Sequence, residues 1–310
     1  MKTTRILLLA LSALVAFSAE AANRKLVMIA GTRSHGPLAH EFNAGVLLLA
    51  KCLKDTPGLD VVVNLNGWPK DESIFNGADA VFIYSDGGGG HPAIQGDRLK
   101  TLDGLMKKGV GLGLAHYAVE VPADKGGQEF LKWTGGYFET HWSVNPHWTA
   151  EFKTFPVHPT TRGVKPFAAN DEWYFHMRFP EGMKGTTPIL SAIAPDSTVS
   201  RGDGPHSGNP AVREAVKNRL PQHVAWSTER ADGGRGFGFT GGHNHLNWGN
   251  DDLRKLVLNS LLWVSKVEVP ANGVASKVSQ DDLMANLDPK GGAKPAVKPT
   301  AKAATADAPR

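Results

Sequence analysis

Four short apolar segments, each bounded by glycine or polar residues, constrain the fold of this chain most strongly. Short runs of aliphatic and β-branched residues are typical of buried strands. Segments with helical spacing of apolar residues, 41–54 and 98–108, alternate with them, and the second stops at Gly109, a common helix terminator. This alternation predicts an open, mostly parallel sheet with helices on both faces. The four apolar segments are residues 25–31, 60–65, 78–84 and 110–115.

Histidines follow three of these predicted strands. His35 lies in the loop after the first, His91 in the glycine loop 85–92 after the third, and His116 directly after the fourth. Ligands of open α/β sheets bind beyond the carboxyl ends of the strands. We therefore expect these histidines, and His116 above all, at a ligand-binding edge. His35 shares its loop with His40, and for both the alternative is a solvated or loop-capping histidine.

A fifth apolar run begins the sequence GFGFTGGHNHLNW, residues 236–248. In this sequence a single residue separates His243 from His245. Alternate side chains of an extended chain point in opposite directions. The two imidazoles can therefore share a site only if the backbone turns, which Gly241 and Gly242 permit.

The two ends of the chain differ in composition from its middle. Residues 1–21 combine Lys2 and Arg5, an apolar run and an Ala-Glu-Ala site, which predicts a cleaved signal peptide and a periplasmic or secreted protein. We expect one folded domain over residues 22–268. The Ala/Lys/Pro-rich segment 269–310 is predicted to be a disordered tail. After residue 21, no stretch comes close to the length of about 18 consecutive apolar residues that a transmembrane segment needs.

The net charge argues against nucleic-acid binding, and the single cysteine excludes an internal disulfide. Removing the +1 of the signal and the +2 of residues 271–310 from the formal net charge of +4 leaves about +1 on the folded part. A nearly neutral domain argues against nucleic-acid binding. The single cysteine, Cys52, lies in a helical segment and is interpreted as a small buried hydrophobe.

Several short motifs follow one another in an order that is characteristic of a known family. They are Gly113–His116 (GLAH), Gly135–Phe138 (GGYF) with His141, His158–Pro159, Asp171–Tyr174 (DEWY), Ala225–Trp226 and residues 234–248. Over about residues 25–265 the chain thus resembles the ThuA-like (trehalose utilisation) family. That family is similar to class I glutamine amidotransferases, so the resemblance implies a flavodoxin-like three-layer α/β/α fold and a role in sugar catabolism.

The same resemblance excludes amidotransferase chemistry. Those enzymes have a nucleophilic cysteine at the elbow after a central strand and a His-Pro-Glu sequence near the C-terminus. Here His116 occupies the elbow, and residues 243–245 read His-Asn-His. The nucleophile and the terminal carboxylate are therefore both missing.

Three residues are predicted to be catalytic: His116, His243 and Glu172 of the DEWY motif. Imidazoles with a carboxylate suit a divalent, zinc-like metal, for which His116, His243 and His245 are the predicted ligands. The metal-free alternative uses the same side chains as general acid and base. No nucleotide is expected, because the glycine loop 87–90 lacks the P-loop Lys and Ser/Thr.

Aromatic residues beside the histidine segments point to a carbohydrate, because indole faces stack on sugar rings. The predicted substrate-binding residues are His35, His91, His141, Trp142, Trp173, Tyr174 and Trp248. We expect an exported enzyme that hydrolyses, eliminates from or isomerises a keto-sugar or glycoside with help from a metal or histidines. Ordinary glycosidase chemistry needs two carboxylates, and only Glu172 qualifies. The alternative is a non-catalytic carbohydrate-binding protein.

Overall fold

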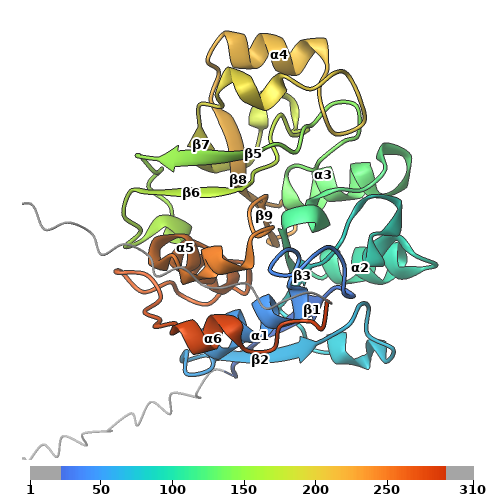
Figure 1. Cartoon of the computed structure of the whole chain (residues 1–310). Helices are drawn as coiled ribbons and strands as arrows, with labels where there is room; N and C mark the ends of the chain where they lie inside the picture. Colours follow the sequence, from blue (N-terminus) through green and yellow to red (C-terminus); the bar gives the residue numbers. More distant parts are fainter. Residues whose placement is uncertain (1–21, 291–310) are drawn as a thin grey trace, which may run out of the picture.

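The computed structural model describes residues 22–290, and a seven-stranded sheet in the order β2-β1-β3-β4-β9-β8-β7 forms its centre (Figure 1). The first five strands of this order are parallel, and β8 and β7 extend the sheet in antiparallel fashion. The predicted mostly parallel, flavodoxin-like α/β fold is confirmed. The strands are β1 Arg24–Ala30, β2 Leu59–Asn64, β3 Ala80–Tyr84, β4 Gly111–Ala115, β7 Thr186–Ala192, β8 Gln222–Glu229 and β9 Arg235–Phe239.

Helices cover both faces of the sheet, so alternate residues of one strand enter different cores. Leu26 and Met28 of β1 belong to the core beneath α1 and α5, whereas Val27 and Ile29 belong to the core beneath α2 and α3. This two-sided burial explains why the parallel strands read as continuous apolar runs. The helices are α1 Phe42–Leu53, α2 Arg98–Met106, α3 Gln128–Thr134, α4 Pro210–Lys217, α5 Asp251–Val264 and α6 Gln280–Met284.

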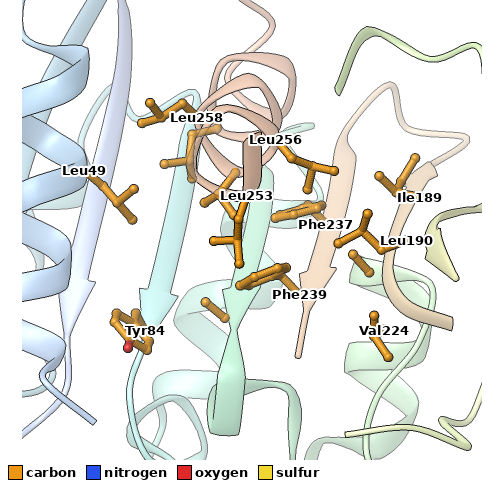
Figure 2. Packing of buried hydrophobic residues seen from close by; sticks show 14 of the residues in the cluster. Leu49, Tyr84, Ile189, Leu190, Val224, Phe237, Phe239, Leu253, Leu256 and Leu258 are labelled. Atoms are coloured by element: carbon orange, nitrogen blue, oxygen red, sulfur yellow. The ribbon is translucent and has the colours of Figure 1, made fainter. Parts of the chain in front are cut away.

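Helix α5 fixes the position of β9, the strand that leads to His243. Figure 2 shows Leu253 and Leu256 of α5 packed over Phe237 and Phe239 of β9, and all four side chains are buried. Burial of each such side chain is worth about 1.5–3 kcal/mol. The loop that follows β9 therefore begins from a rigid base.

The irregular middle of the chain forms a separate two-stranded antiparallel sheet of β5 His147–Phe152 and β6 Phe167–Glu172. Buried and exposed residues alternate along β5, as expected for a sheet with one face in the core. Strand β6 ends at Asp171 and Glu172, the two carboxylates of the DEWY motif.

The sequence predicts a disordered tail from residue 269 onward, and the structure differs from this prediction over residues 269–290. Val269, Val274 and Leu283 are buried in the core, and α6 lies beside α1 at the end of the molecule opposite to α4 (Figure 1). These three apolar residues provide anchors that the composition of the Ala/Lys/Pro-rich segment as a whole conceals. Residues 269–290 are thus part of the folded domain.

Two other predictions concern the ends of the chain and lie outside the described residues. They are the signal peptide of residues 1–21 and the tail beyond residue 290. Among the helices of residues 22–290, none combines the length and apolar character needed to cross a membrane.

Candidate functional site

Four side chains from four separate segments meet at the carboxyl edge of the central sheet. One ligand atom of each lies within 4.8 Å of those of the other three. We call them the central cluster: His40 from the loop after β1, His116 after β4, Glu172 at the end of β6 and His243 from the loop after β9.

His116 begins a short 3-10 turn directly after β4, with a φ of 54°. The left-handed region costs a residue with a β-carbon about 1–2 kcal/mol, so the surrounding contacts must hold it there. Its ring is fully buried, and Nδ1 lies 2.9 Å from the carbonyl oxygen of Thr240. Because a carbonyl only accepts, Nδ1 donates its hydrogen and Nε2 presents a lone pair to the cluster.

His40 is fixed in the same tautomer by a different partner. Its ring is 1% exposed, and Nδ1 lies 2.8 Å from Oδ1 of Asp86. The carboxylate accepts the Nδ1 hydrogen, which leaves a lone pair on Nε2. The backbone N–H of His40 also donates to the carbonyl of His243 at 3.1 Å, so the loops after β1 and β9 are joined directly.

The ring nitrogens of the three histidines converge on one point. Nε2 of His40 lies 2.9 Å from Nε2 of His116 and 3.0 Å from Nδ1 of His243. Two lone pairs that face each other at this distance repel unless an electrophile lies between them. Ligand atoms around a tetrahedral zinc ion, with bonds of about 2.0–2.1 Å, are separated by about 3.3 Å, which is close to the spacing here.

Burial keeps these imidazoles in the form that binds metals. Desolvation, followed by the neighbouring histidines, lowers the pKa of His40 to about 2, and burial holds the pKa of His116 well below its ordinary value. Both rings are therefore neutral near pH 7. Neutral imidazole whose second nitrogen donates to a carbonyl or carboxylate is the usual arrangement of a metal-bound histidine.

Glu172 adds a negative charge to the cluster. Its Oε2 lies 3.1 Å from Nδ1 of His243 and 3.6 Å from Nε2 of His116, and its Oε1 accepts a hydrogen bond from Asn145 at 3.0 Å. Burial opposes ionisation, but the hydrogen bond that Nδ1 of His243 donates while it carries a proton holds the pKa of Glu172 below its ordinary value. Nδ1 of His243 can bind a cation only after it has lost that proton. The side chain is thus a carboxylate at neutral pH.

Tyr174 completes the inner wall of the site. Its hydroxyl lies 3.3 Å from Nε2 of His116 and 3.3 Å from Oε2 of Glu172. Burial and the nearby Glu172 raise the pKa of Tyr174 well above its ordinary value, so the group remains a phenol that can donate a hydrogen bond.

Asp171 holds the loop after β9 in place. This buried carboxylate accepts hydrogen bonds from the backbone N–H groups of Gly242 at 2.7 Å and Asn244 at 3.0 Å, and from the side chain of Asn247 at 2.9 Å. The residue before Glu172 therefore shapes the loop that presents His243.

The structure brings together the three residues predicted to be catalytic, His116, His243 and Glu172, but it places His245 elsewhere. The ring of His245 is buried, and its Nε2 lies 2.9 Å from the carbonyl oxygen of Leu283. Gly242 does turn the chain, with a φ of 107°, yet the two histidines still diverge. His40 takes the position in the cluster that His245 was predicted to occupy.

Three predicted substrate-binding residues lie in the interior instead. Trp173 and Trp248 are fully buried, and the indole N–H of Trp173 donates to Ala169. His91 is also buried, and its two ring nitrogens contact the backbone of Ala118 and Ala93 at 3.0 Å each. These side chains support the loops from within and have no surface to offer a ligand.

Tyr174, also predicted to bind substrate, is buried and lines the central cluster, and the other three predicted residues occupy different surroundings. His35 is exposed and stacks on His40, with ring centroids 3.5 Å apart, so it forms the rim of the site. Trp142 packs between His176 and Arg178, whose guanidinium lies 3.7 Å from the indole centroid. His141 is exposed, and its backbone N–H donates to Pro205.

The sequence patterns missed His40 as a cluster member and Asp86 as its partner. Both stand in loops that directly follow predicted strands, which was the available signal. The direction of the His40 ring depends on its φ of 50°, and no local sequence pattern reveals that value.

The chain is similar to solved structures and to a protein family. Among solved structures, a protein described as ThuA-like from Bacteroides uniformis has 16% identity and a TM-score of 0.55, covering 81% of this chain and 95% of that one. PurLQS from Thermotoga maritima has 9% identity and a TM-score of 0.41, covering 78% of this chain and 99% of that one. No curated protein matches. A family model described as trehalose utilisation matches residues 27–264, and the chain therefore belongs to the ThuA family.

Proposed function

We propose that this protein is an exported, metal-dependent enzyme that acts on a carbohydrate. In this proposal His40, His116 and His243 bind a divalent, zinc-like cation, and Glu172 is the catalytic carboxylate. The substrate class is proposed from the family's description as trehalose utilisation. Export is proposed from the signal-like residues 1–21.

One observation supports the metal more than any other. Thr240 and Asp86 fix His116 and His40 as Nδ1–H tautomers, and their Nε2 lone pairs then face each other at 2.9 Å. Without an electrophile, this buried arrangement is repulsive. A cation at the point of convergence would turn the repulsion into coordination, with Thr240 and Asp86 as the outer hydrogen-bond partners that orient the ligands.

Three histidine ligands would leave a coordination position for water or substrate, as catalytic zinc sites require. The bound cation would polarise a carbonyl or lower the pKa of a bound water. In this proposal Glu172 would take up the proton of that water, and the Tyr174 hydroxyl would donate a hydrogen bond to a developing oxyanion. These groups suit hydrolysis, elimination or isomerisation beside the carbonyl of a keto-sugar.

The test is the metal content of the purified protein and of two matched variants. His116→Ala removes a cluster ligand, whereas His223→Ala removes a half-buried histidine that contacts Ser191. We expect about one bound zinc per chain in the wild-type protein and in His223→Ala, and none in His116→Ala. Absence of metal from the wild-type protein, after incubation with zinc and desalting, would falsify the metal site.

Activity is tested separately, by screening simple and 3-keto glycosides with and without chelator. We expect turnover of an oxidised glycoside that chelator abolishes and added zinc restores. Turnover that is insensitive to chelator would instead favour histidines acting as acid and base. Binding of sugars without turnover would favour a non-catalytic carbohydrate-binding protein.

A further inference from the structure

Residues 279–290, which we call the C-terminal strap, cross from α6 to the loop that holds His40. The strap begins with a capping box, in which Ser279 and Asp282 exchange hydrogen bonds at the start of α6. Lys51 of α1 forms an ion pair with Asp282. Leu283 is buried, and its carbonyl oxygen faces Nε2 of His245 at 2.9 Å. His245 thus anchors the strap from the β9 side.

Beyond α6 the strap binds the opposite side of the site, the start of α1. The backbone N–H of Asp288 donates to Oε2 of Glu41 at 2.9 Å, and Oδ1 of Asp288 accepts a hydrogen bond from Asn43 at 2.9 Å. Arg33 donates to the carbonyl of Pro289 at 2.6 Å. These contacts tie the last described residues of the chain to both flanks of His40.

Lys290 makes the closest contact with the His40 backbone. Its side chain is 1% exposed, and its ammonium donates to the carbonyl of Ala39 and, at 3.0 Å, to that of His40. The same ammonium lies 3.4 Å from Oε1 of Glu41, itself 1% exposed. Burial of a charge is unfavourable unless it is paired and hydrogen-bonded, so this pair holds its geometry closely.

The backbone of this loop needs such external support. Leu38 has a φ of 64° and His40 a φ of 50°, both in the left-handed region that residues with a β-carbon disfavour. Strained backbone of this kind persists only where the surroundings determine it. Glu41 helps by accepting from the N–H of Leu38 at 2.9 Å, and the strap in turn holds Glu41.

We infer that the C-terminal strap positions His40 in the central cluster and that Lys290 is the positioning residue through which it acts. The inference rests on the proposed metal site for its effect on affinity. Its structural half, the immobilisation of the His40 loop, does not depend on a metal. The two halves are tested separately.

The affinity test measures zinc binding by competition with a chromophoric chelator. Lys290→Met removes the ammonium but keeps the length of the side chain, and Lys290→Arg is the conservative rescue. Lys51→Met is the matched control, because it breaks an exposed contact of the same strap away from the loop. Loss of an outer partner of a metal ligand typically weakens binding about 10–100-fold, and we expect this loss for Lys290→Met. Lys290→Arg and Lys51→Met should remain within about threefold of wild type.

The second test uses hydrogen exchange of the metal-free protein. We expect faster exchange in residues 38–43 for Lys290→Met and for a truncation after Met284, with β3 and β4 unchanged. A truncation after Lys290 removes only residues beyond those that the structure describes, and its hydrogen exchange should match that of the full chain. If the wild-type protein does not bind zinc and the two variants still show this exchange pattern, the metal site is refuted and the role of the strap is kept. Equal zinc affinity and equal protection in Lys290→Met would overturn the inference, and so would a uniform loss of protection in β3 and β4.

Discussion

The loops after β1 and after β9 each deliver one histidine to the central cluster, but they are held in opposite ways. The β9 loop contains Gly241 and Gly242 and is fixed by Asp171, the residue beside Glu172. The β1 loop places His40 in left-handed backbone and is fixed by Lys290, 250 residues further along the chain. The β9 loop contains the glycines that form its turn, whereas the β1 loop depends on a distant segment for its conformation.

The largest effect on the β9 loop should come from Asp171→Ala. This change leaves the buried N–H groups of Gly242 and Asn244 without their acceptor, at about 1–3 kcal/mol for each lost partner. We expect the free energy of unfolding to fall by about 3–5 kcal/mol in urea titrations. Asp171→Asn, which retains one acceptor oxygen, should lose clearly less. Equal losses in the two variants would contradict the assigned hydrogen bonds.

The two histidines that the sequence and the structure rank differently give the next test. His40→Ala should weaken zinc binding at least about 100-fold, or about 2.7 kcal/mol, because it removes a ligand. His245→Ala removes only an anchor of the strap and should weaken binding less than about tenfold. Isothermal titration of zinc into both variants measures the difference, and the reverse ranking would restore His245 as the ligand.

A smaller effect is expected from Gly242→Ala in the β9 loop. Gly242 has a φ of 107°, and an added β-carbon would meet Trp248 and Tyr84 only at ordinary contact distances of 3.4 Å. The cost is therefore backbone strain, about 1–3 kcal/mol. Thermal unfolding of the variant should show it, and an unchanged midpoint would mean that this loop tolerates rearrangement.

The smallest effect should come from Arg33→Ala in the β1 loop. Arg33 is exposed and contacts the strap through the carbonyl of Pro289 alone. A surface change of this kind usually alters stability by less than about 0.5 kcal/mol. Zinc affinity should change less than about twofold in the chelator competition. A loss as large as that of Lys290→Met would shift the positioning role from Lys290 to Arg33.

The sequence predicts the sheet and the edge where the site lies because both follow from local patterns. Apolar runs buried on two sides, such as 25–31 and 110–115, report strands directly. The carboxyl ends of parallel strands must share one edge, so the meeting of His116 with residues of the β9 loop also follows from the pattern.

Side-chain direction and burial are not local properties, and here the predictions fail or fall short. Trp173 and Trp248 stand in loops rich in polar residues, yet both rings are fully buried against Phe239 and its neighbours. The direction of His245 is set by its bond to Leu283, 38 residues away. The sequence did not predict the strap, because a few buried apolar residues barely alter the composition of an Ala/Lys/Pro-rich segment.

The strap also sets the order of events when the chain is made. His40 emerges early during synthesis, but its carbonyl receives the Lys290 hydrogen bond from a residue 250 positions later. Contacts of such long sequence separation form late, because the intervening chain must first be ordered. A chain that ends at residue 284 therefore contains every strand of the sheet and the buried residues Val269, Val274 and Leu283, while His40 still lacks the contact with Lys290. Completion of the site then reports that synthesis has passed residue 290.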